Sequence, residues 1–250
     1  MKNSQVNAVP DGAEKLREEL WAITESPSYQ LVRKQVYEAL RKNIILGAIR
    51  GGERIVEGQI AEMAGVSRIP VREAFRMLET EGFVENLPRR GTRVIGVTEG
   101  DICEIFRIHG AVEELCCNYI VEEAAEETIS EGKVILDLAR AALEIRLPDN
   151  QPTPWNGEYD LRFNQWIGRA SGRRRLGCLY EQYNSYIAIL HKYRSIEPER
   201  WRQALEEHAA IWEALSRRDR EAARRAVQIH AENSLEALAR RREQIQPGTP

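Results

Sequence analysis

The segment EGQIAEMAGVSRIPVREAFRMLETEGFVENLPRRGTRVIGV, residues 57–97, decides the fold of the N-terminal part of the chain. Its beginning carries a short apolar edge that ends at Gly65, which is typical of a short helix. Ser67 is a favourable N-cap for a second helix, and Pro70 falls in the first turn, where proline is tolerated. Apolar residues then recur at spacings of four and three from Val71 to Leu78, so the arginines between them face away from the core. The segment therefore predicts two short helices joined by a turn.

A two-stranded hairpin is predicted after the second helix. Its strands read FVENL and TRVIGV, with a tight turn of Pro88, Arg89, Arg90 and Gly91 between them. Helix, turn, helix and a basic-tipped hairpin, in this order, predict a winged helix-turn-helix, whose second helix reaches DNA bases and phosphates from its beginning. The arginines placed to do so lie along the second helix and at the turn: Arg68, Arg72, Arg76, Arg89 and Arg90.

The distribution of charge agrees with phosphate binding by one part of the chain. Residues 29–97 contain twelve Lys and Arg against eight Asp and Glu, a net +4, whereas the whole chain is −3, which leaves −7 for the rest. A basic segment in an otherwise acidic chain is expected where only that segment, residues 29–97, binds DNA. The alternative is a small helical domain whose arginines are merely solvated. It does not explain why the Ser-Arg helix start, the spaced arginines and the basic turn occur together.

At these residues the chain resembles the GntR family of bacterial transcription regulators. The resemblance is carried by VSRIPVREAFRMLETEGFVENLPRRGTRVIGV and, upstream, by LVRKQVYEALRKNIILGAIRGGERIVEGQIAEMAG, and it covers roughly residues 29–97. It implies DNA contacts from the recognition helix and the wing tip by Ser67, Arg68, Pro70, Arg72, Arg90 and Gly91. Family members often have a basic residue early in the preceding helix, where this chain has Gly58.

Length and composition set the class of protein. The 250 residues, 42% of them hydrophobic, suffice for two domains with real cores. No apolar run approaches a membrane span, and four cysteines show neither metal-type spacing nor a disulfide framework, so a cytoplasmic protein is expected. Residues 1–28 are expected to form a partly mobile arm, in which Leu16, Leu20 and Ile23 permit a short amphipathic helix. Residues 246–250 are expected to form a tail.

After Val97 the pattern becomes helical throughout. We expect helices near residues 98–125, 127–147, 155–171, 173–194, 197–216 and 218–245, with breaks at 148–152, 171–172, 195 and 218–219. The predicted fold class is therefore mainly α. A winged helix-turn-helix domain with a small β wing spans residues 29–97, and an all-α bundle of about six helices spans residues 98–245.

Four polar residues in this half form a candidate metal site. His208 and His230 lie inside apolar stripes of separate predicted helices, while Asp160 and Asn164 share one face of a third. A carboxylate, an amide oxygen and two imidazoles suit zinc, nickel, manganese or iron without selecting among them. A histidine on an apolar face is more often a hydrogen-bonded core residue, so the spacing alone leaves both interpretations open.

The helical half resembles the ligand-binding FCD domain of FadR-type members of the family. The resemblance is carried by the segments FRIHGAVEE, DLRFN, EEHAAIWEALSRRDREAARRA and IHAEN. It implies a metal held by one aspartate and three histidines, capped by a carboxylate-bearing metabolite. Asp160, His208 and His230 match these ligands, and Asn164 stands where the family usually has the third histidine.

A second departure concerns the effector. The resemblance implies an arginine four residues before Glu113 that pairs with the effector's carboxylate, and this chain has His109 there. A neutral imidazole does not make the two-pronged contact of a guanidinium. Either His109 binds a different chemical group, or Arg107 or another residue supplies the charge.

The expected function is that of a homodimeric transcription regulator, more often a repressor in this family, on a pseudo-palindromic operator. Its expected partners are double-stranded DNA, a second copy of the chain and a small organic or sugar acid, with no membrane partner. A first alternative keeps the DNA-binding domain but treats the helical half as a metal-free dimerisation bundle. A remote alternative is a metalloenzyme, which the lack of a recognisable general base disfavours.

Overall fold

The computed structural model describes residues 11–21, 23, 28–87, 91–144, 155–193 and 198–245. The chain divides into two compact units between Glu99 and Gly100. Several sequence-based expectations lie outside the described residues: the polar start of the arm, the breaks at 148–152 and 195, the wing-tip arginines Arg89 and Arg90, and the tail at 246–250.

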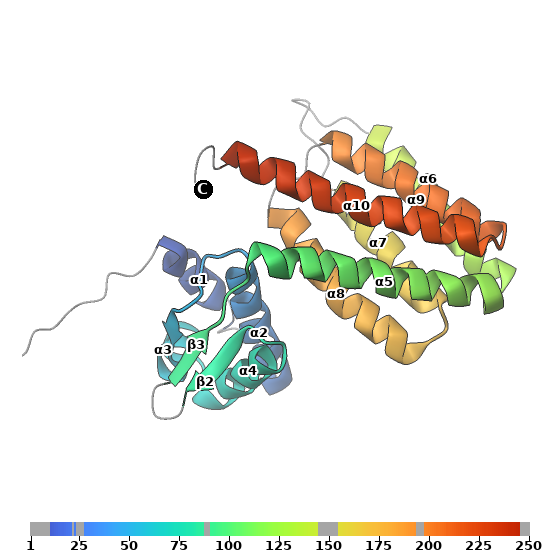
Figure 1. Cartoon of the computed structure of the whole chain (residues 1–250). Coiled ribbons are helices and arrows are strands. Elements are labelled where there is room, and N and C mark those ends of the chain that lie inside the picture. The colour runs from blue at the N-terminus through green and yellow to red at the C-terminus, as the bar shows by residue number, and fades with distance from the viewer. Residues whose placement is uncertain are drawn as a thin grey trace, which may run out of the picture. The chain divides into compact units, whose positions relative to one another are not determined.

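The first unit is a winged helix-turn-helix, as predicted (Figure 1). Its elements are α1 (Asp11–Trp21), α2 (Tyr29–Ile45), β1 (Arg54–Ile55), α3 (Glu57–Met63), α4 (Arg68–Thr80), β2 (Val84–Leu87) and β3 (Gly91–Val94). The strands form one antiparallel sheet in the order β1-β3-β2, in which β3 pairs through Val94 with Val84 and through Arg93 with Arg54. Helices α2 and α4 pack against each other. The residues buried in these helices include Leu40, Ile44, Val71, Phe75 and Leu78.

The turn between α3 and α4 follows from Gly65. This residue adopts a left-handed φ of 61°, which glycine tolerates without steric cost and which ends the preceding helix. Ser67 then has extended backbone angles and occupies the N-cap position of α4, as predicted, although its hydroxyl makes no capping hydrogen bond within the described part of the chain. The chain therefore changes direction within four residues and presents the start of α4.

The expected amphipathic helix in the arm is α1, which packs on α2. Leu16 and Leu20 of this helix are buried, as is Ile23 beyond its end, so this segment contributes to the core of the first unit. Glu19 forms an ion pair with Lys42 of α2.

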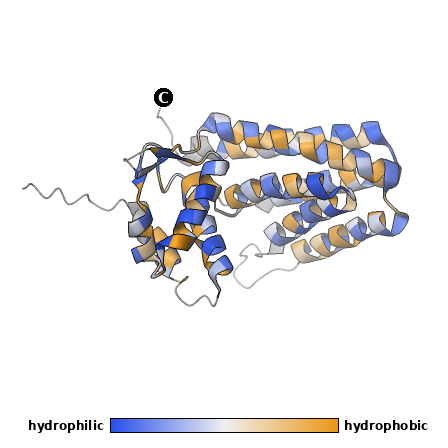
Figure 2. Cartoon of the chain, turned by 90° about the horizontal axis from the view of Figure 1, so that it is seen from below, coloured by the Kyte–Doolittle hydropathy of each residue, from blue (hydrophilic) through white to orange (hydrophobic). Residues whose placement is uncertain are grey.

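The second unit contains six helices in its described residues, and they match the six predicted from the sequence. They are α5 (Glu99–Glu123), α6 (Glu126–Glu144), α7 (Trp155–Ala170), α8 (Arg174–Tyr193), α9 (Pro198–Ser216) and α10 (Arg220–Ile245). Helix α9 lies beside α10 and α6, and α7 packs against α6 and α8 (Figure 1). Each helix carries both hydrophobic and hydrophilic bands (Figure 2). In the described residues no helix combines the length and apolarity needed to cross a bilayer.

The core of the bundle is centred on Trp166, which is fully buried. Its indole Nε1 donates to the carbonyl oxygen of Thr128 at 2.9 Å, so α7 is tied to α6. A Cβ at Gly132 would lie only 2.7 Å from the ring of Trp166, which shows why this position of α6 has no side chain. These contacts fix the face of α7 that carries Asp160 and Asn164.

Candidate functional sites

The first candidate site is the exposed face of α4. Pro70, Val71, Ala74, Phe75 and Leu78 are buried on the opposite face, so Pro70 serves the core of the unit. Ser67, Arg68, Arg72 and Arg76 are exposed, as their spacing predicted.

Two of these arginines pair with glutamates of their own unit. The Arg72 guanidinium donates through Nε and Nη2 to Glu57, at 3.1–3.2 Å, while 54% of its side chain stays exposed. Arg76 donates to Glu73 at 2.9 Å and is 67% exposed. The hydrogen bond and charge of Glu57 raise the pKa of Arg72, so this side chain stays charged. Exposed pairs of this kind contribute little to stability, and both guanidinium-bearing side chains stay more than half exposed, so they can still meet phosphate or base edges.

The wing is partly described. Gly91 begins β3 with a left-handed φ of 81° and is exposed, while Arg93 on the same strand pairs with Glu85 of β2. Glycine adopts this left-handed conformation without steric cost, so it suits the first residue of β3.

The second candidate site is a polar cluster inside the helical unit. It gathers side chains from five helices and includes all four histidines of the chain: His109 and Glu113 of α5, Asp160 and Asn164 of α7, Tyr180 and His191 of α8, Glu207 and His208 of α9, and His230 of α10. An Asp160 carboxylate oxygen lies 3.8 Å from Nε2 of His208, and the other lies 3.9 Å from Nδ1 of His191. The rings of His208 and His230 have centroids 4.6 Å apart. Asp160, His208 and His230 are thus brought together.

A hydroxyl bridge connects three of these helices. The Tyr180 oxygen lies 3.1 Å from Oε1 of Glu113 and 3.0 Å from Oδ1 of Asn164. The single phenolic hydrogen lies within hydrogen-bond distance of both acceptors, so Tyr180 bridges Glu113 and Asn164 as the donor. Burial raises the pKa of Glu113 above its usual value. Asn164 also donates from Nδ2 to the Asp160 carbonyl oxygen at 3.0 Å.

Glu207 organises the opposite side of the cluster. Its Oε2 lies 2.7 Å from Nδ1 of His230 and 3.0 Å from Nη2 of Arg200, and Asn233 donates to its Oε1 at 2.6 Å. Burial opposes the charge on His230, but Glu207 and the other nearby carboxylates outweigh it and raise the pKa of His230. Glu207 therefore fixes the orientation of His230 through one ring nitrogen and leaves the other ring nitrogen for a further contact.

Several buried polar atoms of the cluster have no hydrogen-bond partner among the described residues. They are His109 Nε2, Glu113 Oε2, His191 Nδ1, Arg200 Nη1 and His208 Nε2. Burial lowers the pKa of His109 and of His191 to about 3, and holds that of His208 well below its usual value, so these rings are neutral. Buried groups of this kind are normally satisfied, and neutral imidazoles are the form that binds metals. The cluster is chemically suited to a polar ligand.

Part of the donor set suits a divalent ion. His208 Nε2 is buried without a partner and faces the Asp160 carboxylate, and the carboxylate on His230 Nδ1 is the support usual for a metal-binding histidine. However, no group of three or more His, Cys, Asp or Glu side chains within the described ranges is already arranged as a metal site. Asn164, expected as the fourth donor, already accepts from Tyr180 and has one lone pair left on its amide oxygen.

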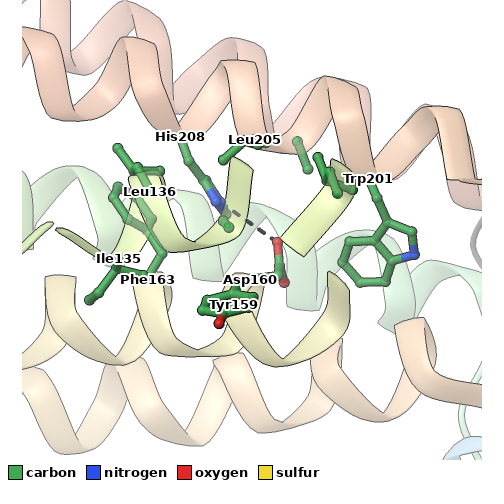
Figure 3. A pocket seen from close by; sticks show the side chains of 11 residues that line it. Ile135, Leu136, Tyr159, Asp160, Phe163, Trp201, Leu205 and His208 are labelled. Carbon is green, nitrogen blue, oxygen red and sulfur yellow. Dashed lines mark ion pairs between the residues drawn. The ribbon is translucent and has the colours of Figure 1, made fainter. Parts of the chain in front are cut away.

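A small cavity adjoins the cluster (Figure 3). Its walls are mostly apolar side chains of α6, α7 and α9, with Asp160 and His208 pointing toward each other at its polar side. Its volume of about 20 Å³ accommodates one water molecule, so a larger ligand requires the helices around it to move apart.

The two effector-binding residues predicted from the sequence, His109 and Arg107, have different environments in the structure. His109 is buried in the cluster and stacks on Tyr180 with ring centroids 4.8 Å apart, whereas Arg107 is exposed. Three residues of the cluster were not predicted from the sequence: His191, Glu207 and Arg200. His191 follows the apolar positions Ile187 and Leu190 on α8, a signal that could have identified it.

Comparison with known proteins gives a consistent result. The family model described as bacterial regulatory proteins, gntR family, matches residues 32–94, and the FCD domain model matches residues 104–233. The chain is 31% identical over 211 residues to an uncharacterised HTH-type transcriptional regulator of Bacillus subtilis, covering 82% of this chain and 89% of the relative. It is 27% identical over 186 residues to the gluconate operon transcriptional repressor of the same organism, covering 72% and 74%. Among solved structures, Escherichia coli McbR/YncC has the same fold, with a TM-score of 0.59, 23% identity, and coverage of 88% of this chain and 100% of that one.

Proposed function

Because this chain belongs to the gntR family of bacterial regulatory proteins and carries an FCD domain, we propose that it is an effector-responsive repressor that binds a pseudo-palindromic operator as a homodimer. The relatives are transcription regulators, so the metalloenzyme alternative is set aside. In this proposal residues 29–97 bind DNA, and residues 98–245 bind the effector and dimerise.

The observation that carries the proposal is the exposed arginine face at the start of α4. Arg68, Arg72 and Arg76 project from the face opposite the buried one, on the second helix of a helix-turn-helix. This is the element that enters a major groove, and arginine is the side chain best suited to guanine edges and phosphates. The wing residues Arg89, Arg90 and Gly91 complete the proposed contact surface.

For the helical domain we propose a divalent ion, zinc, nickel or manganese, together with a small acid. Asp160, His208 and His230 would hold the ion, with the remaining lone pair of the Asn164 amide oxygen as a further donor. A bound ion supplies a Lewis-acid centre that attracts an anionic ligand. The unpartnered Nε2 of His208 and the Glu207 contact to His230 support this assignment.

The acid needs a positive charge that the position of His109 does not supply. Arg107 is exposed, whereas the Arg200 side chain is only 10% exposed and its Nη1 is buried without a partner in the described structure. Arg200 also shares Glu207 with His230, which places it beside the cluster. We therefore assign the carboxylate anchor to Arg200, with His109 contacting a neutral part of the effector.

Regulation requires that the effector bind one state of the protein more tightly than the other. A hundredfold loss of operator affinity corresponds to a coupling free energy of about 2.7 kcal/mol. Helix α5 begins at Glu99, five residues after β3 ends, and it carries His109 and Glu113. In this proposal the effector acts on DNA binding by shifting α5.

Selection of DNA from a random pool tests the DNA-binding function. The wild-type protein is expected to enrich a pseudo-palindromic sequence, because two identical domains read two half-sites. Enrichment of a single asymmetric half-site would contradict the homodimer, and the absence of any enriched sequence would contradict the regulator.

Metal analysis distinguishes the proposal from the metal-free dimerisation bundle. Purified wild-type protein and a His208→Ala/His230→Ala variant are exposed to zinc and dialysed, and circular dichroism confirms that both are folded. We expect close to one ion per wild-type chain and far less in the variant. Equal, negligible metal in both would support the metal-free bundle.

A further inference from the structure

The first turn of α3 contacts two of the exposed arginines of α4. Glu57, the first residue of α3, accepts from Arg72 across a sequence separation of fifteen residues. Gly58 follows it, and a Cβ built there would lie 3.4 Å from Nη2 of Arg68 and 3.7 Å from its Nε. The guanidinium of Arg68 therefore lies across the backbone of Gly58, and that of Arg72 lies against Glu57.

The edge of Arg72 that Glu57 occupies determines which edge remains free. A guanidinium has five N–H donors, one on Nε and two on each terminal nitrogen. Glu57 engages Nε and one hydrogen of Nη2, at 3.1–3.2 Å. Both hydrogens of Nη1 and the second hydrogen of Nη2 remain, and this terminal edge is one that matches the O6 and N7 acceptors of guanine.

A paired arginine also differs from a free one in its preference for phosphate. Without Glu57, Arg72 would be a flexible cation that any backbone phosphate attracts, because phosphate contacts carry no sequence information. With Glu57, its net charge is locally balanced and its plane is fixed. The carboxylate therefore weakens binding to arbitrary DNA while it supports a directed contact with a base.

On the basis of the DNA-binding function proposed above, we propose that the Glu57–Gly58 turn is the positioning element for sequence specificity. Glu57 orients Arg72 toward a guanine, and Gly58 leaves the space in which Arg68 lies. Neither residue needs to touch DNA to act in this way.

The test compares Glu57→Gln with Glu62→Gln. Glu62 is exposed on the same helix, so the control removes the same charge from α3 without touching the Arg72 pair. Affinities for the duplex selected by the wild-type protein, for single-base variants of it and for a scrambled duplex are measured by fluorescence anisotropy over a range of salt concentrations.

We expect Glu57→Gln to reduce the preference for one guanine in each half-site by roughly tenfold, a large part of what one bidentate contact contributes. Affinity for the scrambled duplex should be unchanged or higher, with an equal or steeper salt dependence. Glu62→Gln should keep the wild-type preference. The positioning role is wrong if Glu57→Gln also keeps the wild-type preference for the guanine. It is equally wrong if Glu57→Gln loses the same affinity for the selected duplex as for the scrambled duplex.

A second pair of variants tests Gly58. Gly58→Ala adds a Cβ in ordinary contact with Arg68 and should keep the preference, whereas Gly58→Leu should displace Arg68 and alter the preferred base at a different position from Glu57→Gln. An unaltered preference in Gly58→Leu would contradict the role of Gly58. If the wild-type protein enriches no sequence, the proposed DNA-binding function itself is wrong. This result is distinct from the variant results above, which contradict only the positioning roles of Glu57 and Gly58.

Discussion

Replacing Tyr180 with phenylalanine removes the hydroxyl that joins α5, α7 and α8. The ring is fully buried and its volume is kept, so the change tests the hydrogen bonds alone. Two buried partners, Glu113 and Asn164, lose a contact of 3.1 Å and 3.0 Å respectively. The contact that Asn164 keeps with Asp160 is made by Nδ2, so the acceptor oxygens of Asn164 and Glu113 both lose a partner. Because each unsatisfied buried polar group costs about 1–3 kcal/mol, we expect a loss of about 3 kcal/mol.

The assay is urea denaturation at pH 7, in which the free energy of unfolding is compared at an equal slope. Tyr183→Phe is the matched control, because Tyr183 lies on the same helix and is half-buried outside the hydroxyl bridge. The control should change the free energy of unfolding by less than about 0.5 kcal/mol. A loss in Tyr180→Phe no larger than in the control would refute the bridge.

Three further predictions concern the helical domain. Burial raises the folded-state pKa of Glu113, so the stability that Glu113 contributes is fully present below its unfolded pKa of 4.5 and is lost as the pH rises through the folded-state pKa. Glu113→Gln should therefore gain stability relative to the wild type between pH 5 and pH 8 in denaturation experiments. A stability difference that does not change with pH would contradict this prediction. Gly132→Ala places a Cβ 2.7 Å from buried Trp166 and should cost about 1–3 kcal/mol, measured by thermal unfolding. Wild-type stability of this variant would contradict the close packing of α6 on Trp166. The third prediction concerns zinc added after chelation and dialysis. Zinc should raise the melting temperature of the wild type by roughly several degrees and that of His230→Asn hardly at all. Equal shifts in the two proteins would contradict the assigned ligands.

The sequence predicted the fold well because the relevant signals are local. Gly65, the N-cap at Ser67 and the periodicity of Val71, Phe75 and Leu78 are all contained within about a dozen residues, and each corresponds to a helix end or a buried face in the structure. The six helices of the second unit were predicted for the same reason.

The polar partners were not predictable in the same way. The Glu57–Arg72 pair spans fifteen residues and the His230–Glu207 pair twenty-three, so no helical periodicity connects them. Arg200 has the sequence context of an ordinary surface residue near the start of α9, and only the packing of α9 against α10 buries it beside Ser234. Long-range electrostatic partners are fixed by tertiary packing, which a single sequence does not reveal.

The central claim is that the arginine face of α4 recognises a DNA duplex by its sequence. Its most direct test is the affinity of Arg72→Ala, measured beside the surface control Arg202→Ala, for the selected duplex and for a scrambled one. We predict that Arg72→Ala loses roughly ten- to a hundredfold in affinity for the selected duplex and much less for the scrambled one, while Arg202→Ala matches the wild type. Wild-type affinity of Arg72→Ala for the selected duplex, or an equal loss on both duplexes, would contradict the account.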